Sequence, residues 1–364
     1  MSGSLVQLVA QGVQDTYLTS NPEVSFFKQV YRRHTNFASK PLRLDYIGTA
    51  AANNEVTVKI PNKGDLLTHV WVDLGTGNVD DALKASDENG GMTVELYIGG
   101  QLIDRQDAFF MIQLWNKFLV DQGSKAFACM TSTDNDVDSR TNVLASTWFP
   151  LHFFFCDGFG LPLVALQYHE VEIHFRFSSG ASIADKFNVY ANYVMLDTVE
   201  RDAVVNTKHD ILIEQMQKIQ SDNTKFDLNL LNHPVKALMW GNPNIAGSVF
   251  TTDDVQIYLN GTELFGSPMP DKYFTYVQPY YASEYASELM KGSAIGSGSS
   301  LKMYSFAQKA SRHQPTGSCN FSRLDNSTLH IGTIANAPAS LYMYAVNYNI
   351  LHIEGGMAGV AFSN

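Results

Sequence analysis

The side chains that come closest to a metal-binding pattern lie in the segment HEVEIH, residues 169–174. A zinc site of the H-E-x-x-H type places two histidines four positions apart on one face of a helix. His169 and His174 are five positions apart, and the alternation of apolar and polar residues around them predicts a strand with the two rings on opposite faces. No H-x-H pair occurs in the sequence, and His352-Ile353-Glu354 is interpreted as a pair on a terminal strand. We therefore predict no metal site.

Signatures of nucleotide binding and acyl transfer are also missing from the sequence. The Gly-Ser-rich segment KGSAIGSGSSLK, residues 291–302, lacks the Gly-Lys-Ser/Thr of a phosphate-binding loop. Its composition predicts an exposed flexible loop. No G-x-S-x-G nucleophile elbow occurs. We predict that the protein is not an enzyme and that it needs no cofactor.

A basic cluster near the N-terminus could bind an acidic partner or a nucleic acid. It comprises Lys28, Arg32, Arg33 and His34. Upstream, Asn21-Pro22-Glu23 combines an N-cap residue, a proline at the first position and an acid at the positive end of the dipole, which predicts the start of a helix. The buried face of this helix would be formed by Phe26, Phe27, Val30 and Tyr31. We favour a capped helix with a solvated basic end over a nucleic-acid site.

Three sequons for N-glycosylation begin at Asn260, Asn320 and Asn326. The first residues, MSGSLVQLVAQG, lack the basic residues and the long apolar core of a secretory signal. Because a chain without such a signal does not meet the secretory machinery, we do not expect these asparagines to carry sugars.

The composition indicates a folded protein with extensive contact surface. The 364 residues carry a formal net charge of −11, which argues against a general nucleic-acid binder. Only 17% of the residues are charged, while 12% are aromatic, a combination that favours contacts between subunits. Cys129, Cys156 and Cys319 form neither a disulfide framework nor a zinc-ligand spacing, which predicts a reducing compartment. No apolar run approaches the roughly 18 residues of a membrane span.

Strand patterns dominate from about residue 40 onward. In NNEVTVKI, residues 53–60, apolar and polar residues alternate. A second strand is predicted over 93–98, ending in the turn signal Gly99-Gly100. In QYHEVEIHFRF, residues 167–177, every second residue shares a face. One helix is predicted, over 108–120.

An internal repeat organises these elements. Four blocks recur in the same order at offsets that shrink from 170 to 155 residues: NNEVTVKI (53–60) with NTKFDLNL (223–230), LLTHVW ending at Trp71 with VKALMW ending at Trp240, VELYIGG (94–100) with VQIYLNG (255–261), and YANYVML (190–196) with YAVNYNIL (344–351). We infer two copies of one all-β domain, at 36–202 and 208–364, joined by a linker at 203–207 and preceded by an arm and capped helix at 1–35. Many short strands with turn signals favour a sandwich or jelly roll.

Four longer stretches resemble the major capsid proteins of nucleocytoplasmic large DNA viruses, a group that includes phycodnaviruses, iridoviruses and mimivirus relatives. The stretches are LVQLVAQGVQDTYLTSNPEVSFFKQVYRRHTNFA (5–38), FFFCDGFGLPLVALQYHEVEI (153–173), YSFAQKASRHQPTGSCNFSRLDN (304–326) and YAVNYNILHIEGGMAGVAFSN (344–364). Because they lie at both ends and in the middle, the resemblance covers essentially the whole chain.

The resemblance implies an all-β double jelly roll, two consecutive eight-stranded jelly rolls with a few short helices in loops. It also implies homotrimers that form pseudo-hexagonal capsomers and tile the icosahedral shell of a large double-stranded DNA virus. Neighbouring capsomers, minor capsid proteins and a penton protein would be the partners, with an internal membrane beneath and no specific nucleic acid. The protein would belong to the outer shell of the virion and would be made and assembled in the host cytoplasm. Short insertions between strands depart from the family pattern and imply a low outer profile.

Two sets of residues are the candidate contacts for such a role. The candidates for the inner face are Leu5, Leu8, Val9, Lys28, Arg32 and Arg33. The candidate aromatic anchors of a trimer interface are Tyr273, Phe274, Tyr276, Tyr280 and Tyr281, although a core strand followed by a tyrosine-rich loop explains this segment equally well. The alternatives to a major capsid protein are a tandem β-sandwich that binds carbohydrate or a receptor, and a minor capsid paralogue. A single-jelly-roll penton subunit would lack the duplication.

Overall fold

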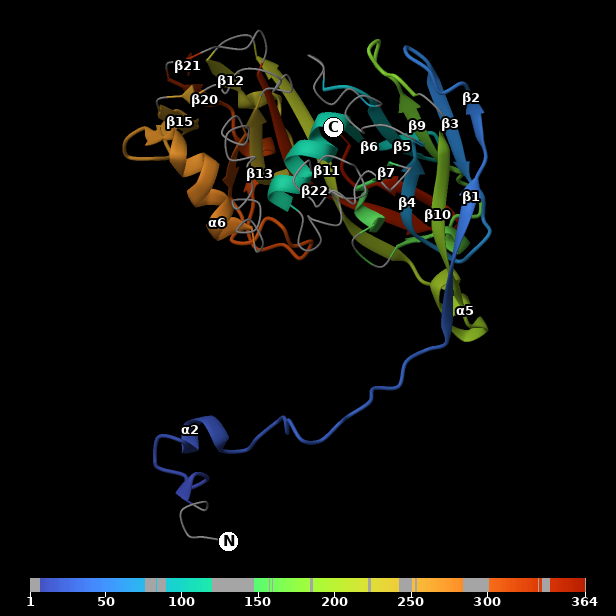
Figure 1. Cartoon of the computed structure of the whole chain (residues 1–364), viewed down its shortest axis with the longest axis vertical. Helices are drawn as coiled ribbons and strands as arrows, with labels where there is room; N and C mark the ends of the chain where they lie inside the picture. The colour runs from blue at the N-terminus through green and yellow to red at the C-terminus, as the bar shows by residue number, and fades with distance from the viewer. Residues whose placement is uncertain are drawn as a thin grey trace. The chain divides into compact units, whose positions relative to one another are not determined.

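The computed structural model separates the chain into two compact units, residues 1–36 and 37–364, which are described separately (Figure 1). The described residues are 7–75, 83, 90–119, 147–156, 158, 160–183, 186–221, 224–241, 251–252, 254–283, 301–332, 334–335 and 341–363.

The described residues of the first unit include the short helical turn α2 (Thr16–Thr19). The helix predicted to begin at Asn21 is absent: residues 20–36 contain no helical turn, and Asn21 adopts a positive φ of 51°. The apolar side chains that would form its buried face remain exposed, Phe26 at 93%. A short helix without a packed apolar face is only marginally stable, so the capping signal at Asn21 does not suffice.

The first half of the second unit consists of two antiparallel sheets. Sheet A has the order β1-β10-β4-β7, with β8 beside β4. Its strands are β1 (Phe37–Leu44), β10 (Asn188–Leu196), β4 (Leu66–Asp73), β7 (Trp148–Pro150) and β8 (Leu161–Pro162). Sheet B has the order β2-β3-β9-β5-β6. Its strands are β2 (Tyr46–Gly48), β3 (Glu55–Ile60), β9 (Val171–Arg176), β5 (Thr93–Ile98) and β6 (Gln101–Asp107).

Local sequence patterns explain the strands of sheet B. Along β9 buried and partly exposed residues alternate, as the predicted period of two requires. Gly99 and Gly100 have φ of 58° and 79°, the left-handed backbone that a tight turn between β5 and β6 needs. The predicted strands within 53–60, 93–98 and 167–177 are therefore confirmed.

The second half repeats this arrangement. Sheet C has the order β11-β22-β13-β18, with β19 beside β13 and β23 beside β22, and sheet D has the order β12-β20-β15-β16, with β17 beside β15. The strands of sheet C are β11 (His209–Ser221), β22 (Leu341–Glu354), β13 (Pro234–Gly241), β18 (Lys302–Ser305), β19 (Cys319–Asn320) and β23 (Met357–Val360). Those of sheet D are β12 (Lys225–Asp227), β20 (Ser327–Ile331), β15 (Asp254–Leu259), β16 (Thr262–Glu263) and β17 (Met269–Pro270), and β14 (Thr251–Thr252) pairs with β21 (Ile334–Ala335). Two paired sheets in each half, with the same strand order, confirm the predicted double jelly roll.

Strand pairing shows that two blocks of the sequence repeat are shifted by a residue, the block that ends at Trp71 and the block that begins at Tyr190, whose offset is 154 rather than 155. The bulges in β4 and β13 leave Thr68 and Lys236 without a partner in the strand register. These two residues therefore correspond to each other, at an offset of 168 rather than 169. Tyr190 pairs with Trp71, and its counterpart Tyr344 pairs with Met239. A slip of one residue moves a side chain to the other face of a sheet, so Trp240 is not the counterpart of Trp71.

Short helices occupy the connections. They are η1 (Phe110–Leu119), η3 (Phe154–Cys156), η4 (Leu163–Ala165), α5 (Thr198–Asn206), η5 (Leu228–Leu230), η6 (Tyr273–Val277), α6 (Gln278–Ala282) and η9 (Phe321–Arg323). The helix predicted over 108–120 is confirmed as far as the described residues reach, in the wide turns of a π-helix. The alternative of a core strand from Tyr273 is wrong, because residues 271–282 are helical. Residues 203–206 of the predicted linker belong to α5, and the segment 291–300 lies outside the described residues.

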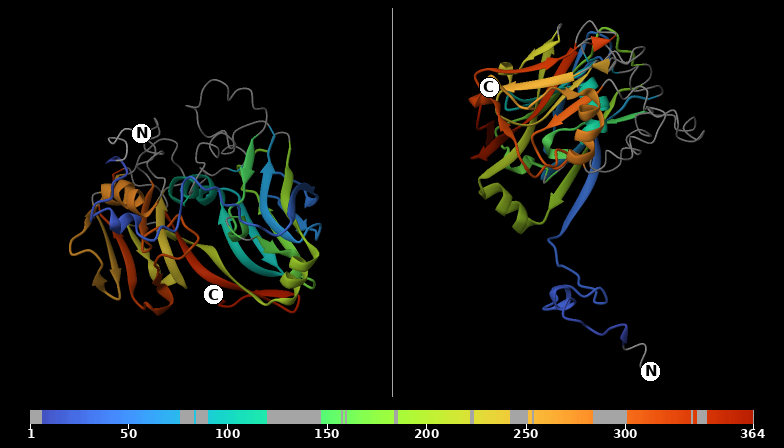
Figure 2. Two further views of the ribbon diagram at one scale, coloured as in Figure 1. Left: turned by 90° about the horizontal axis from the view of Figure 1, so that it is seen from below. Right: turned by 90° about the vertical axis from the view of Figure 1, so that its left-hand side faces the viewer.

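The two hydrophobic cores meet at sheet C. The inner face of sheet C packs on sheet D, with Trp240, Met343 and Ala345 in the second core. Its outer face, with Met239, Tyr342 and Tyr344, belongs instead to the core of the first half. Figures 1 and 2 show the helical turns of η1, drawn in teal, between the sheets of the two halves. Sheet C is thus covered on both faces.

Candidate assembly surfaces

The joint between the two halves is built around Asp107, at the end of β6. Its carboxylate accepts hydrogen bonds from the backbone N–H of Phe110 (2.9 Å), from Lys218 Nζ (2.7 Å) and from the Tyr344 hydroxyl (2.8 Å). Burial raises the pKa of Asp107, and the Lys218 ammonium opposes that shift. The carboxylate therefore begins helix η1 and ties it to β11 and β22 at the same time.

Apolar rings surround this polar contact. The rings of Phe109 and Phe110 lie 5.7 Å and 5.8 Å from the ring of Tyr344. Lys218 Nζ lies 4.3 Å from the ring centre of Tyr342, close enough for a cation–π contact. The first half thus covers the outer face of sheet C with aromatic side chains around one satisfied charge pair.

A second set of buried polar groups extends the joint along β6 and β11. Asp104 accepts hydrogen bonds from the backbone N–H of Met216 (3.0 Å) and from Gln106 Nε2 (2.7 Å), and burial raises its pKa to about 6. Burial alone would also raise the pKa of Glu214, but Lys236 at 2.5 Å and His313 at 3.7 Å hold it below the ordinary value. Asp104 thus holds one half against the other, whereas Glu214 is paired within the second half.

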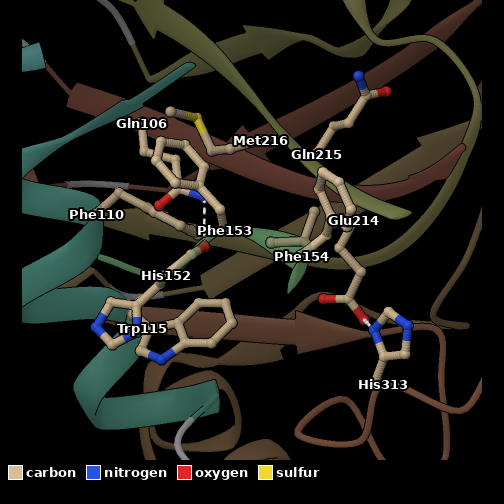
Figure 3. Close-up of a pocket in the computed structure, with 11 residues that line it drawn as sticks. Gln106, Phe110, Trp115, His152, Phe153, Phe154, Glu214, Gln215, Met216 and His313 are labelled. Carbon is tan, nitrogen blue, oxygen red and sulfur yellow. Dashed lines mark hydrogen bonds and ion pairs between the residues drawn. The ribbon is translucent and has the colours of Figure 1, made fainter. Parts of the chain in front are cut away.

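A small cavity lies within the joint (Figure 3). Its volume is about 20 Å³, which suits one water molecule and no organic substrate. The lining residues are Gln106, Phe110, Trp115, His152, Phe153, Phe154, Glu214, Gln215, Met216, His313 and Val346. His152 stacks on Trp115 at 4.8 Å, and burial lowers its pKa to about 3, so the imidazole is neutral at pH 7. The cavity is therefore a packing feature of the joint.

The outer face of sheet A carries a stack of three aromatic rings. Trp71 lies 6.5 Å from Trp148 and 5.9 Å from Tyr190, and Trp148 lies 5.7 Å from Tyr190, all with nearly parallel planes. These side chains come from the neighbouring strands β4, β7 and β10, and each is half-buried. No sequence pattern predicts this cluster, because its members are brought together only by strand pairing.

The predicted contact residues fall into different environments. Leu8 and Val9 are about 80% exposed, and Lys28, Arg32 and Arg33 are exposed, while Leu5 lies outside the described residues. Among the predicted interface aromatics, Phe274 is fully buried in the second core, and Tyr273 and Tyr276 are half-buried. Tyr280 and Tyr281 on α6 are 60% and 69% exposed. The sequons at Asn260, Asn320 and Asn326 are on the surface.

The residues considered as metal ligands have other partners. His169 Nδ1 accepts a hydrogen bond from the backbone N–H of Ala358 (3.1 Å), whereas His174 lies between Glu55 and Glu172. His352 contacts Asp210 and Glu354. Among the described residues, no group of three or more histidine, cysteine or acidic side chains is arranged to hold a metal ion. Cys319 is a free thiol, and Cys129 lies outside the described residues.

In the part of the chain that the structure describes, none of the helices combines the length and the apolarity needed to cross a bilayer.

Comparisons with known proteins match both halves. Residues 25–204 match the family model described as major capsid protein N-terminus, and residues 200–359 match that of the large eukaryotic DNA virus major capsid protein. The chain is 37% identical to the major capsid protein of Pyramimonas orientalis virus and 32% identical to that of Paramecium bursaria Chlorella virus 1, in each case over the full length of both chains.

Solved structures agree with these matches. The quasi-atomic model of the PBCV-1 virus capsid superposes with a TM-score of 0.75 at 30% identity, over 93% of this chain and all of that chain. The Faustovirus major capsid protein shares the fold, with a TM-score of 0.68 at 12% identity over 94% of each chain. The chain with its two jelly rolls and their buried joint therefore belongs to the family of major capsid proteins of large eukaryotic DNA viruses.

Proposed function

We propose that this capsid protein forms homotrimers in which six jelly rolls make a pseudo-hexagonal capsomer, and that these capsomers tile an icosahedral shell. The observation that carries the proposal is the duplication, because two jelly rolls of the same strand order allow three chains to present six similar units. We divide the chain accordingly into an arm (1–35), a first jelly roll (36–202), a linker (203–207) and a second jelly roll (208–364).

The proposed role is structural rather than enzymatic. The buried carboxyl groups of β6, Asp104 and Asp107, are engaged in holding the two halves together. Assembly then depends on surface complementarity, and an obligate interface buries about 2,000 Å² or more.

The first unit supplies the proposed contacts beneath the capsomer. Its apolar and basic side chains, among them Leu8, Val9 and Arg32, are exposed within the single chain. Exposed apolar clusters of this kind mark interaction sites. Minor capsid proteins and the penton protein are the proposed partners there, with the membrane side reached indirectly and with assembly in the host cytoplasm.

The mass of the purified protein in solution tests the proposal. Light scattering after size exclusion should give three times the chain mass of 40.4 kDa, and the particle should resist dilution. Imaging should then show hexagonal arrays at high concentration. A particle that stays at 40.4 kDa at all concentrations, and that binds glycans on the aromatic stack of sheet A, would favour the carbohydrate-binding alternative.

A further inference from the structure

The duplicated fold produces two equivalent outer faces, of which the described residues of the chain bury one. Tyr344 on sheet C packs against Phe109 and Phe110 next to η1, and Asp107 at the start of this helical segment bonds to Lys218 and to the Tyr344 hydroxyl. A helical segment of one jelly roll thus lies on the outer face of the next jelly roll.

Sheet A presents the equivalent face. Its Tyr190 corresponds to Tyr344 and its Trp71 to Met239, as the matching bulges and strand pairs require. Arg43, which pairs with Tyr190, likewise corresponds to Lys218, which pairs with Tyr344. Met239 and Tyr344 are fully buried, whereas Trp71 and Tyr190 are only half-buried.

The side chains on the outer face of sheet A also resemble those of a protein interface. It presents three large stacked rings and the exposed guanidinium of Arg43. The buried Trp71 Nε1 has no hydrogen-bond acceptor among the described residues. Tryptophan, tyrosine and arginine are the residue types enriched in the energetic centres of protein interfaces.

The segment η6–α6 is the counterpart of η1. Both helical segments follow the edge strands of the smaller sheet and precede the outer strand of the larger one, β18 in the second half and β7 in the first. Phe274 anchors η6 in its own core, which leaves Val277, Tyr280 and Tyr281 exposed. Figure 1 shows α6 and the pair β1–β10 at opposite sides of the body. A contact between these two surfaces therefore needs a second chain.

We propose that η6–α6 of one chain docks on the outer face of sheet A of a second copy, and that Val277, Tyr280 and Tyr281 pack against Tyr190 and the rings stacked on it. This contact between two chains has the same arrangement as the joint that η1 makes within one chain. It rests on the proposed homotrimer and names the surfaces that build it. Because the two surfaces differ, the interface is heterologous, and three chains close a ring of six joints, three internal and three between chains.

The occupant is a second copy because the internal joint already shows this kind of helical segment on this kind of face. Aromatic rings on a sheet could also stack on a sugar or receive an unrelated protein. If one of those occupants bound this face instead, replacing Tyr280 and Tyr281 would not change the mass of the oligomer.

Complementation between two variants tests the proposal. The first variant carries Tyr280→Arg and Tyr281→Arg, and the second carries Tyr190→Arg, which places an unpaired charge on the other surface. Leu230→Arg is the matched control, since Leu230 is also exposed, at 66%, and lies on η5. Masses are measured by light scattering, and folding is verified by circular dichroism during thermal unfolding.

Each variant alone should lose the trimer at concentrations where the wild type and Leu230→Arg are fully trimeric. An equimolar mixture should form a dimer of twice 40.4 kDa and no trimer, because each variant keeps one intact surface. The recovered dimer also shows that both variants are folded.

The other outcomes separate the inference from the proposed function. If the wild type is trimeric and the variants remain trimeric, or if folded variants do not pair when mixed, the assignment of surfaces is wrong while the homotrimer stands. Loss of the trimer in Leu230→Arg as well would likewise overturn the assignment. A wild type that never forms trimers overturns both.

Discussion

Strands β10 and β22 occupy the same position in the two jelly rolls but have opposite environments. Along β10 buried residues alternate with half-buried ones, whereas the first nine residues of β22 are all buried. The inward-facing residues of both strands pack on the smaller sheet of their own half. The difference lies in the outward face, which the first half covers on β22. The same strand position is therefore a surface in one half and an interior in the other.

The substitution with the largest expected effect is Asp107→Ala, at the covered face of sheet C. Replacing this residue by alanine removes the carboxylate that accepts hydrogen bonds from Lys218, from the Tyr344 hydroxyl and from the first turn of η1. We expect the free energy of unfolding to fall by about 3 kcal/mol, the cost of breaking a buried ion pair. Denaturant titration gives the value.

Arg43→Ala changes sheet A at the residue that corresponds to Lys218, the partner of Asp107. Because Arg43 is exposed, we expect its replacement to lower the free energy of unfolding of the separated chain by less than about 0.5 kcal/mol. Equal losses at Asp107 and Arg43 would show that the two faces do not differ in the way described.

Asp104 and His152, two buried groups of the joint, should each contribute to the pH dependence of the free energy of unfolding. Burial raises the pKa of Asp104 from 3.8 to about 6, so the native state alone binds this proton between about pH 6 and 4, and acid stabilises it. Burial lowers the pKa of His152 from 6.5 to about 3, so the unfolded chain binds that proton first, and acid destabilises the native state. In the wild type these two contributions nearly cancel between pH 6 and 4.

The variant Asp104→Asn removes only the stabilising contribution. Relative to the wild type, it should lose stability as the pH falls from 6 to 4, by about 1 kcal/mol per pH unit. Unfolding titrations at pH 7, 6, 5 and 4 measure the difference, in which the other titrating groups cancel. Parallel curves for the two proteins would contradict the proposed role of Asp104.

The smallest expected effect comes from removing a tyrosine hydroxyl, either at Tyr344 or at its counterpart Tyr190. Tyr344→Phe removes a hydroxyl that donates to buried Asp107 and should cost about 1 kcal/mol. Tyr190→Phe should cost almost nothing in the separated chain, since Tyr190 lies on the half-buried face. Thermal unfolding of both variants at one concentration compares them. A larger loss at Tyr190 than at Tyr344 would reverse the comparison.

Much of the fold could be predicted from the sequence because strand periodicity is local. The alternation in 167–177 and the turn at Gly99-Gly100 locate β9 and the β5–β6 hairpin, and the repeat locates the two halves. The face of Trp240 was not predicted, because the match aligned it with Trp71 at an offset of 169, whereas the equivalent bulges in β4 and β13 correspond at an offset of 168.

The candidate surfaces were less predictable for a different reason. The aromatic stack of sheet A joins residues from positions 71, 148 and 190, and the Asp107–Lys218 pair joins the two halves, so both depend on tertiary contacts. The helix expected at Asn21 has strong local signals but does not form, because the described residues of its unit leave its apolar side chains exposed.

The position of β22 also bears on how the chain folds during synthesis. Every strand of sheet A and sheet B precedes residue 197, so the first jelly roll can form while the ribosome is still producing the second. β22 is the central strand of sheet C, yet it is translated after β11, β13 and β18. Phe109 and Phe110 therefore have no completed surface to pack on until translation passes residue 354, and the nascent chain needs protection from aggregation over that interval.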